Sequence, residues 1–166
     1  ARGAAVLLIS EDLEEIRALA DVIHVMSAGR LSPGFPRGTI GQAELALEQL
    51  CRRAVRREAF GKKLAELGAN FDIIANARME IEMARLLCLK AAWMMDQGDP
   101  RAAAPWISQI KVVAPLMALK VLDEAVQMHG AGGISQDHSL ARAWQHVRTL
   151  RLADGPDAVH RRQVAR

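Results

Sequence analysis

The segment Glu66–Asp96, ELGANFDIIANARMEIEMARLLCLKAAWMMD, decides the fold class of this 166-residue chain. Its apolar residues recur at three- and four-residue steps, the spacing that gathers side chains on one face of an α-helix. The predicted buried face consists of Leu67, Phe71, Ile74, Ile81, Ala84, Cys88, Ala91 and Met95. The glycine and proline in Gln97–Pro100 predict the end of this long helix.

Segments with the same helical spacing lie on either side of it. They are Gly41–Arg57, a segment from about Pro105 to His129, Leu140–Leu150, and a short last helix that starts at Pro156. In the segment ending at His129, the inward residues are expected to be Ile110, Val113, Met117, Val121 and Met128. Gly130 is expected to end that helix as a C-cap. Long helices joined by short turns predict a mainly α chain, with an antiparallel four-helix bundle over residues 40–166.

The first residues have a different pattern. Residues 4–9 form an apolar run typical of a buried strand, a helix is expected to start after Ser10, and Val22–Met26 is expected to be a second strand. We therefore predict a β-α-β fragment over residues 1–33 and a linker over residues 34–39. Two strands and one helix cannot bury their own apolar faces, so this fragment needs a larger sheet.

Composition and charge exclude several functional classes. With 51% hydrophobic and 25% charged residues, the chain can build a core and is not globally disordered. The net charge is +3, and two basic clusters could face nucleic acid or anionic lipid. They lack the interleaved aromatic residues of single-strand binders, which favours solvated helix faces and no nucleic acid. The five histidines share no metal-ligand spacing, so no metal is expected, and His160 is expected on a helix surface.

Cys51 and Cys88 are isolated, with neither CxxC spacing nor a disulfide framework, which indicates a reducing compartment. The apolar run at the N-terminus is too short to span a bilayer and has no signal-peptide layout. We therefore expect a cytoplasmic protein with no membrane span.

Three motifs fall where predicted helices start or end, and loops of this kind commonly carry binding and chemistry. They are Arg57–Lys62 (REAFGK), Gln127–Gly133 (QMHGAGG) and Arg151–Asp157 (RLADGPD). The first offers cations for phosphate, the second glycines that let a ligand approach the backbone, and the third a carboxylate. Together they favour an anionic cofactor combined with a proton transfer.

With these motifs in this order, residues 40–166 resemble the C-terminal helical domain of acyl-CoA dehydrogenases. The segments Ile81–Arg85 and Ala91–Trp93 add to the resemblance. It implies a flavoenzyme that removes hydrogens from the α and β carbons of an acyl-CoA thioester. The β hydrogen leaves as hydride to FAD, and a carboxylate takes the α proton. The chain alone is expected to be inactive, because the N-terminal helical and β domains of the family hold much of the flavin and substrate.

The resemblance also implies which residues bind FAD. Arg57 would contact the pyrophosphate and Phe60 would pack near the adenine, on a cofactor held mainly by a neighbouring subunit. Gln127, Gly130, Ala131, Gly132 and Gly133 would line the same cofactor. The implied partners are a second copy, in a homodimer or homotetramer, and an electron-transferring flavoprotein.

Asp154 is the candidate base. The family usually has Tyr-Glu-Gly-Thr here, whereas this chain has Ala153-Asp154-Gly155-Pro156. Aspartate is shorter by one C–C bond, about 1.5 Å, so the thioester must lie closer or the helix must shift. Pro156 replaces a threonine that helps to hold flavin and cannot donate a hydrogen bond. A subgroup of the family has a similar Ala-Asp-Gly-Pro-Asp pattern, followed by Glu where this chain has Ala158.

A second resemblance concerns residues 1–33. Ala5–Leu13 and Asp21–Met26 are similar to the end of the degenerate second cassette of ABC-transporter ATPases that serve sugar or nucleoside import. Glu11 stands where a switch histidine is expected, and the chain has no P-loop or signature motif. We interpret the chain as a chimera or a fragment. The alternative functions are an ABC-transporter remnant fused to a helical bundle, or a bundle that serves only self-association.

Overall fold

The computed structural model describes residues 22–23, 26–27, 30–31, 35–36 and 39–166. The described elements are β1 (Val22–Ile23), β2 (Met26–Ser27), β3 (Arg30–Leu31), β4 (Phe35–Pro36), α2 (Thr39–Arg56), β5 (Glu58–Ala59), β6 (Lys62–Lys63), the 3-10 helix η1 (Leu64–Glu66), α3 (Asn70–Asp96), α4 (Pro100–His129), α5 (Ala131–Ile134), α6 (Leu140–Leu150) and α7 (Asp157–Val164).

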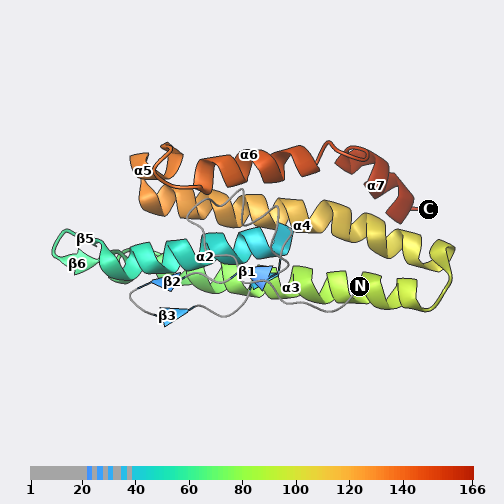
Figure 1. The fold of residues 1–166 in the computed structure, drawn as a ribbon, viewed down its shortest axis with the longest axis horizontal. Helices are drawn as coiled ribbons and strands as arrows, with labels where there is room; N and C mark the ends of the chain where they lie inside the picture. The colour runs from blue at the N-terminus through green and yellow to red at the C-terminus, as the bar shows by residue number, and fades with distance from the viewer. Residues whose placement is uncertain (1–21, 24–25, 28–29, 32–34, 37–38) are drawn as a thin grey trace, which may run out of the picture.

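The predicted antiparallel helical bundle is confirmed. Helices α2, α3, α4 and α6 lie along the long axis of the molecule, and each runs opposite to the one before it (Figure 1). Helix α4 is central, because it packs against α2, α3, α6 and α7. The largest fully buried side chains are Leu50, Val121, Leu122, Ile81, Leu140 and Val147, and they come from all four long helices.

Helix α4 starts five residues earlier than expected, at Pro100 rather than near Pro105. Asp99 is its N-cap, and its carboxylate accepts hydrogen bonds from the backbone N–H groups of Arg101 (2.9 Å) and Ala102 (3.3 Å). Proline at the first helical position needs no N–H partner there. The Asp-Pro pair therefore ends one helix and starts the next. Both Pro105 and Pro115 lie inside the helix.

The predicted buried face of α3 is only partly correct. Ile81, Ala84 and Ala91 are buried as expected, but Phe71 is 65% exposed and Met95 46% exposed, and Cys88 is also exposed. In α4, Val113 is likewise 39% exposed, against expectation. A further set of large apolar side chains on α3 is exposed, namely Met79, Met83, Leu86, Leu89 and Trp93. The α3 helix therefore presents an apolar surface that nothing in the described part of the chain covers.

Of the expected second strand, Val22–Met26, the structure describes the two ends, and these pair with different segments. Val22–Ile23 pairs with Phe35–Pro36, and Met26–Ser27 pairs with Arg30–Leu31, both antiparallel and in separate two-stranded sheets. One of these strands falls inside the predicted linker, residues 34–39, and α2 begins at its last residue. The expected strand at residues 4–9 and the helix after Ser10 lie outside the described residues. The domain boundary at 33 stays a prediction.

Among the described residues, α4 is the helix whose length and composition would allow it to span a bilayer. The place of α4 at the centre of the bundle accounts for its apolar composition without a membrane. It contacts α2, α3, α5, α6 and α7, and 44% of its most apolar stretch is buried inside the bundle. A central helix of a helical domain is apolar for this reason alone.

Candidate functional site

The Arg57–Lys62 motif forms a tight β-hairpin rather than a simple loop. Strands β5 and β6 pair through Glu58 with Lys63 and Ala59 with Lys62. The two loop residues, Phe60 (φ 51°) and Gly61 (φ 75°), both have positive φ, as in the primed turns that fit the twist of a hairpin. The Phe60 side chain is 97% exposed at the tip. The turn therefore holds an aromatic ring out from the bundle.

Arg57 directly follows α2 and is exposed. Its backbone is fixed, because its N–H donates to the carbonyl of Arg53 (2.9 Å) and its carbonyl accepts from the N–H of Leu64 (3.0 Å). No side chain in the described part of the chain bonds to its guanidinium. A free, planar guanidinium on a fixed backbone is suited to binding phosphate.

The Gln127–Gly133 motif covers the end of α4 and the short α5. Gly130 (φ 65°) is the C-cap, as predicted, and its N–H reaches the carbonyls of Val126 and Gln127. Gln127, Gly130 and Ala131 are exposed, and Gly132 is half-buried. Gly133 is different, because a Cβ there would come within 2.5 Å of the Val126 carbonyl oxygen. The missing side chain of Gly133 is therefore explained by packing against α4, without any ligand.

His129, the last residue of α4, lies in a partly buried position. Its Nδ1 lies 2.8 Å from the carbonyl of Ala125, and its ring meets that of His138 edge-on, with centroids 4.8 Å apart. Burial lowers the pKa of His129 below the ordinary 6.5, and the nearby charges of His138 and Arg53 lower it further, against the Ala125 hydrogen bond that raises it. The neutral ring is therefore the form that the fold favours.

This pKa predicts a pH effect on stability. Because the folded pKa of His129 is depressed, the unfolded chain takes up the proton first as the pH falls. Stability present above about pH 6.5 is therefore lost progressively below it. We expect His129→Gln to flatten the decline of the unfolding midpoint in urea between about pH 7 and pH 5. His146→Gln, at an exposed position of α6, should leave the decline unchanged, and parallel profiles for wild type and His129→Gln would contradict the assignment.

Asp154 lies in the turn between α6 and α7. It has φ 53°, the following Gly155 has φ 101°, and the Asp154 side chain is exposed. No described residue donates a hydrogen bond to its carboxylate. The carbonyl of Asp154, in contrast, lies 3.3 Å from Nε2 of His160. The predicted surface histidine is thus half-buried and contacts the backbone of the candidate base.

Two charged side chains fix the same turn, and sequence analysis did not identify them. Lys111 of α4 donates from Nζ to the carbonyls of Leu150 (2.5 Å) and Ala153 (2.7 Å). Arg151 donates from Nε (2.9 Å) and Nη2 (2.6 Å) to Oδ2 of Asp157, and this hydrogen bond lowers the pKa of Asp157. Hydrogen bonds to charged groups contribute about 1.5–3 kcal/mol each, enough to offset strain in a short turn.

Phe60 and Asp154 share an uncommon backbone conformation. Within the described part of the chain, they are the non-glycine residues with positive φ. Such a conformation costs about 1–3 kcal/mol and persists where the surroundings fix it, commonly at ligand and active sites. Both residues were candidate site residues from the sequence. The hairpin turn accounts for the positive φ of Phe60, and aspartate adopts a positive φ more readily than most residues.

The candidate residues do not converge in one chain. The β5–β6 hairpin and α5 lie at the same end of the bundle, whereas the α6–α7 turn lies further along it (Figure 1). Helix α6 separates the Gln127–Gly133 turn from Asp154, and its 11 residues rise about 16 Å. One copy therefore presents two separate surfaces, one with guanidinium, aromatic ring and glycines, the other with the carboxylate.

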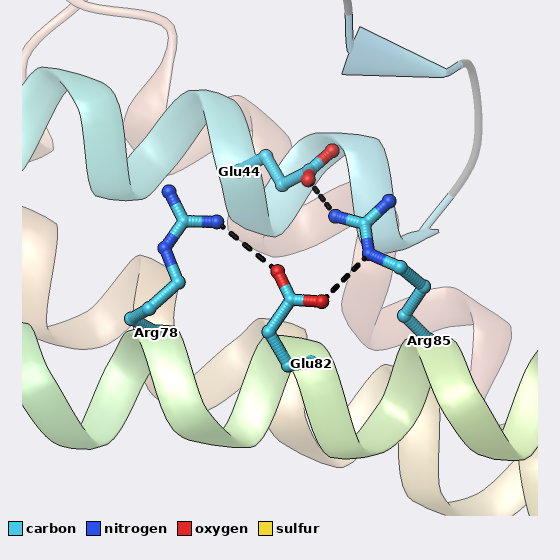
Figure 2. Close-up of polar contacts among 4 residues, drawn as sticks. All are labelled: Glu44, Arg78, Glu82 and Arg85. Carbon is cyan, nitrogen blue, oxygen red and sulfur yellow. Dashed lines mark hydrogen bonds and ion pairs between the residues drawn. The ribbon is translucent and has the colours of Figure 1, made fainter.

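A charged network ties α2 to α3 and so supports the helix that ends at Arg56, directly before Arg57. Figure 2 shows Arg85 between Glu44 and Glu82, with Arg78 on the far side of Glu82. Arg85 bonds to Glu44 through Nη2 and to Glu82 through Nε (3.1 Å), and Arg78 Nη1 lies 3.4 Å from Glu82. The Glu44 side chain is only 7% exposed, and its second oxygen has no partner. Glu44 and Arg85 are 41 residues apart, so no local pattern could reveal the pair.

No group of three or more histidine, cysteine, aspartate or glutamate side chains among the described residues could hold a metal ion.

A sequence model of the acyl-CoA dehydrogenase C-terminal domain matches residues 22–166. The chain belongs to the acyl-CoA dehydrogenase family. Acyl-CoA dehydrogenase family member 11 of Rattus norvegicus is 48% identical over 144 residues, which is 85% of this chain and 18% of the rat protein. The chain thus spans about a fifth of that relative, and it corresponds to the C-terminal helical domain of the family.

Solved structures agree on the fold. A structure from Mycobacterium abscessus that is assigned to the acyl-CoA dehydrogenases is 54% identical with a TM-score of 0.75, covering 76% of this chain and 31% of that one. The FAD complex of PigA is 24% identical with a TM-score of 0.71, covering 76% of this chain and 33% of PigA, and shows a likeness of fold alone. The family match includes residues 22–33, so the ABC-transporter alternative is not supported.

Proposed function

We propose that this acyl-CoA dehydrogenase domain contributes to an FAD-dependent α,β-dehydrogenation of an acyl-CoA thioester, with Asp154 as the base that removes the α proton. A bound flavin would accept the β hydrogen as hydride. The observation that carries the proposal is that Phe60 and Asp154, within two of the family motifs, are both exposed and both have positive φ. By family resemblance, an electron-transferring flavoprotein is the proposed acceptor.

The residues at the hairpin end fit an FAD nucleotide. The free Arg57 guanidinium suits the pyrophosphate, and the exposed Phe60 ring offers a stacking surface for an adenine. Gln127 and the exposed Gly130 and Ala131 lie at the same end of the bundle, next to the half-buried Gly132. These residues would bind and orient the nucleotide. The charged Asp154 carboxylate would take up the α proton and become neutral, a change that desolvation by bound substrate favours.

The proposed site is composite, formed by Asp154 of one copy and Arg57 of another. The separation of the two surfaces along α6 supports this, because the surfaces of one copy face different regions. The exposed apolar surface of α3, which includes Leu86 (65%) and Met83 (61%), supports burial in a homodimer or homotetramer.

Mixing two defective variants tests the composite site. The assay uses an FAD concentration at which the Arg57→Met variant has no bound FAD. Under this condition neither full-length Arg57→Met nor full-length Asp154→Asn alone should oxidise acyl-CoA. A mixed assembly of both would contain a site with an intact Arg57 and an intact Asp154, so activity should return after subunit exchange. No recovery despite proven mixed assembly would contradict a site shared between copies.

We expect Arg57→Met to weaken FAD binding by about 10- to 100-fold, since a charged hydrogen bond contributes about 1.5–3 kcal/mol. Titration of the apoprotein with FAD, followed by flavin fluorescence, measures this. Arg101→Met is the matched control, because Arg101 is also exposed but lies in the first turn of α4. Equal FAD affinity for the two variants would remove Arg57 from the proposed site.

A further inference from the structure

We infer that Lys111 and His160 are positioning residues that fix the backbone of Asp154 and so the place from which its carboxylate projects, an inference that rests on the proposed role of Asp154 as base. Their contacts are to the two peptide groups on either side of the Asp154 Cα. Lys111 donates to the carbonyl of Ala153, and Nε2 of His160 lies 3.3 Å from the carbonyl of Asp154.

The peptide group before Asp154 is fixed by Lys111. The Ala153 carbonyl and the Asp154 nitrogen belong to one planar unit, so holding the oxygen at 2.7 Å from Nζ holds the nitrogen as well. Lys111 Nζ also donates to the Leu150 carbonyl (2.5 Å), which fixes the end of α6. The lysine itself projects from α4, the most extensively packed helix, and is half-buried.

The peptide group after Asp154 is fixed by His160. A carbonyl oxygen only accepts hydrogen bonds, so Nε2 carries the hydrogen, and Nδ1 is buried without a partner. His160 belongs to α7, whose packing on α4 includes a hydrogen bond from Ser108 to Gln163 (2.6 Å). With both flanking peptides anchored, rotation about the Asp154 backbone bonds is restricted, and the positive φ of 53° is maintained.

The position of the Asp154 Cβ follows from the backbone, because Cβ is bonded to Cα. No described group donates a hydrogen bond to the carboxylate, so the anchored backbone sets the point from which the side chain projects, and rotation about χ1 and χ2 then brings the carboxylate to a substrate. Proton transfer depends on the placement of the carboxylate, and misplacement by about 1 Å can reduce rate by about 100-fold.

A simpler role for Lys111 is to cap the C-terminus of α6, where cations are favourable. The two roles predict different results. A cap would affect stability alone, whereas a positioning residue would also affect the chemical step. The contact to Ala153, three residues beyond the last residue of α6, favours positioning.

The test uses Lys111→Met in the full-length flavoprotein, with Lys120→Met as the matched control on the same helix. Lys120 is exposed and pairs with Glu80 of α3, away from the turn. We expect Lys111→Met to lower kcat by about 10- to 100-fold with KM changed less than about twofold. The kinetic isotope effect with an α-deuterated acyl-CoA should increase, because proton removal becomes slower. Lys111→Arg, which keeps donors, should recover most of the loss.

A second measurement does not depend on activity. Hydrogen exchange of residues 150–160 should be faster in Lys111→Met than in wild type, and unchanged in Lys120→Met. If Lys111→Met does not fold, His160→Leu removes the other anchor and should give the same selective loss of kcat. Stability lowered with kcat and isotope effect equal to those of Lys120→Met would overturn the inference. Turnover retained by Asp154→Asn would instead overturn the proposed function, so the two failures are distinguishable.

Discussion

Asp154→Asn is expected to reduce turnover of acyl-CoA by about 10²- to 10⁴-fold, the range that general-base groups contribute. Asparagine has nearly the same shape and cannot take up the α proton. It also tolerates a positive φ well, so the turn should keep its conformation. Since no described residue bonds to the Asp154 carboxylate, the fold loses no contact, and FAD binding should be unchanged. Stopped-flow bleaching of the flavin after mixing with substrate measures the effect.

Asp157→Asn is the matched control for this experiment. The two aspartates are three residues apart, but Asp157 is paired with Arg151 through bonds of 2.6 and 2.9 Å. Asp157→Asn should lower the stability of the fold. The rate of flavin reduction per folded molecule should stay within several-fold of the wild-type rate. If Asp157→Asn abolishes flavin reduction and Asp154→Asn does not, the assignment of the base is wrong.

Helix ends were predictable where glycine or proline marks them. Gly130 ends α4 with φ 65°, and Pro156 precedes the first residue of α7. Asp99-Pro100 was interpreted only as the end of α3, although an aspartate before a proline is also a helix start. The hairpin after α2 was missed, because Phe60 is an unusual residue for a primed turn and only Gly61 signals it.

Helical periodicity identified α3 but not the face that it buries. Phe71, Cys88 and Met95 fit a three- and four-residue spacing, yet they are exposed, because α3 has apolar residues on several sides. Which side is buried depends on where α2 and α4 lie, and no single segment contains that information. Apolar residues also occur on surfaces that a partner covers in a larger assembly, so an apolar position in the sequence does not have to lie in the core of one chain.

In the candidate site, too, some residues were predictable from the sequence and others were not. Arg57, Phe60 and Asp154 were predictable, because they occur in short motifs of fixed order. Lys111 and His160 were not, since their partners are backbone carbonyls that every residue has. Only the packing of α4 and α7 against the turn brings Lys111 and His160 to the backbone of Asp154.

Arg85→Met is expected to destabilise the bundle by about 3–5 kcal/mol, the range for removing one partner of a buried ion pair. The cause is Glu44, whose side chain is 7% exposed and whose second oxygen already has no partner. Without Arg85 the carboxylate would be buried and unpaired. For a domain of this size the melting temperature should fall by about 6–20 °C.

Two further variants decide whether the buried charge is the cause. Arg78→Met removes a guanidinium from the same helix, but its partner Glu82 is 47% exposed, so the loss should stay near about 0.5 kcal/mol. The double variant Glu44→Met with Arg85→Met removes both charges and should recover most of the stability. If the double variant is as unstable as Arg85→Met alone, lost packing of the arginine side chain explains the effect, and the ion pair contributes little. If the double variant recovers its stability, the loss in Arg85→Met comes from the unpaired buried charge of Glu44. The ion pair then adds little net stability, and its role is to fix how α2 lies on α3.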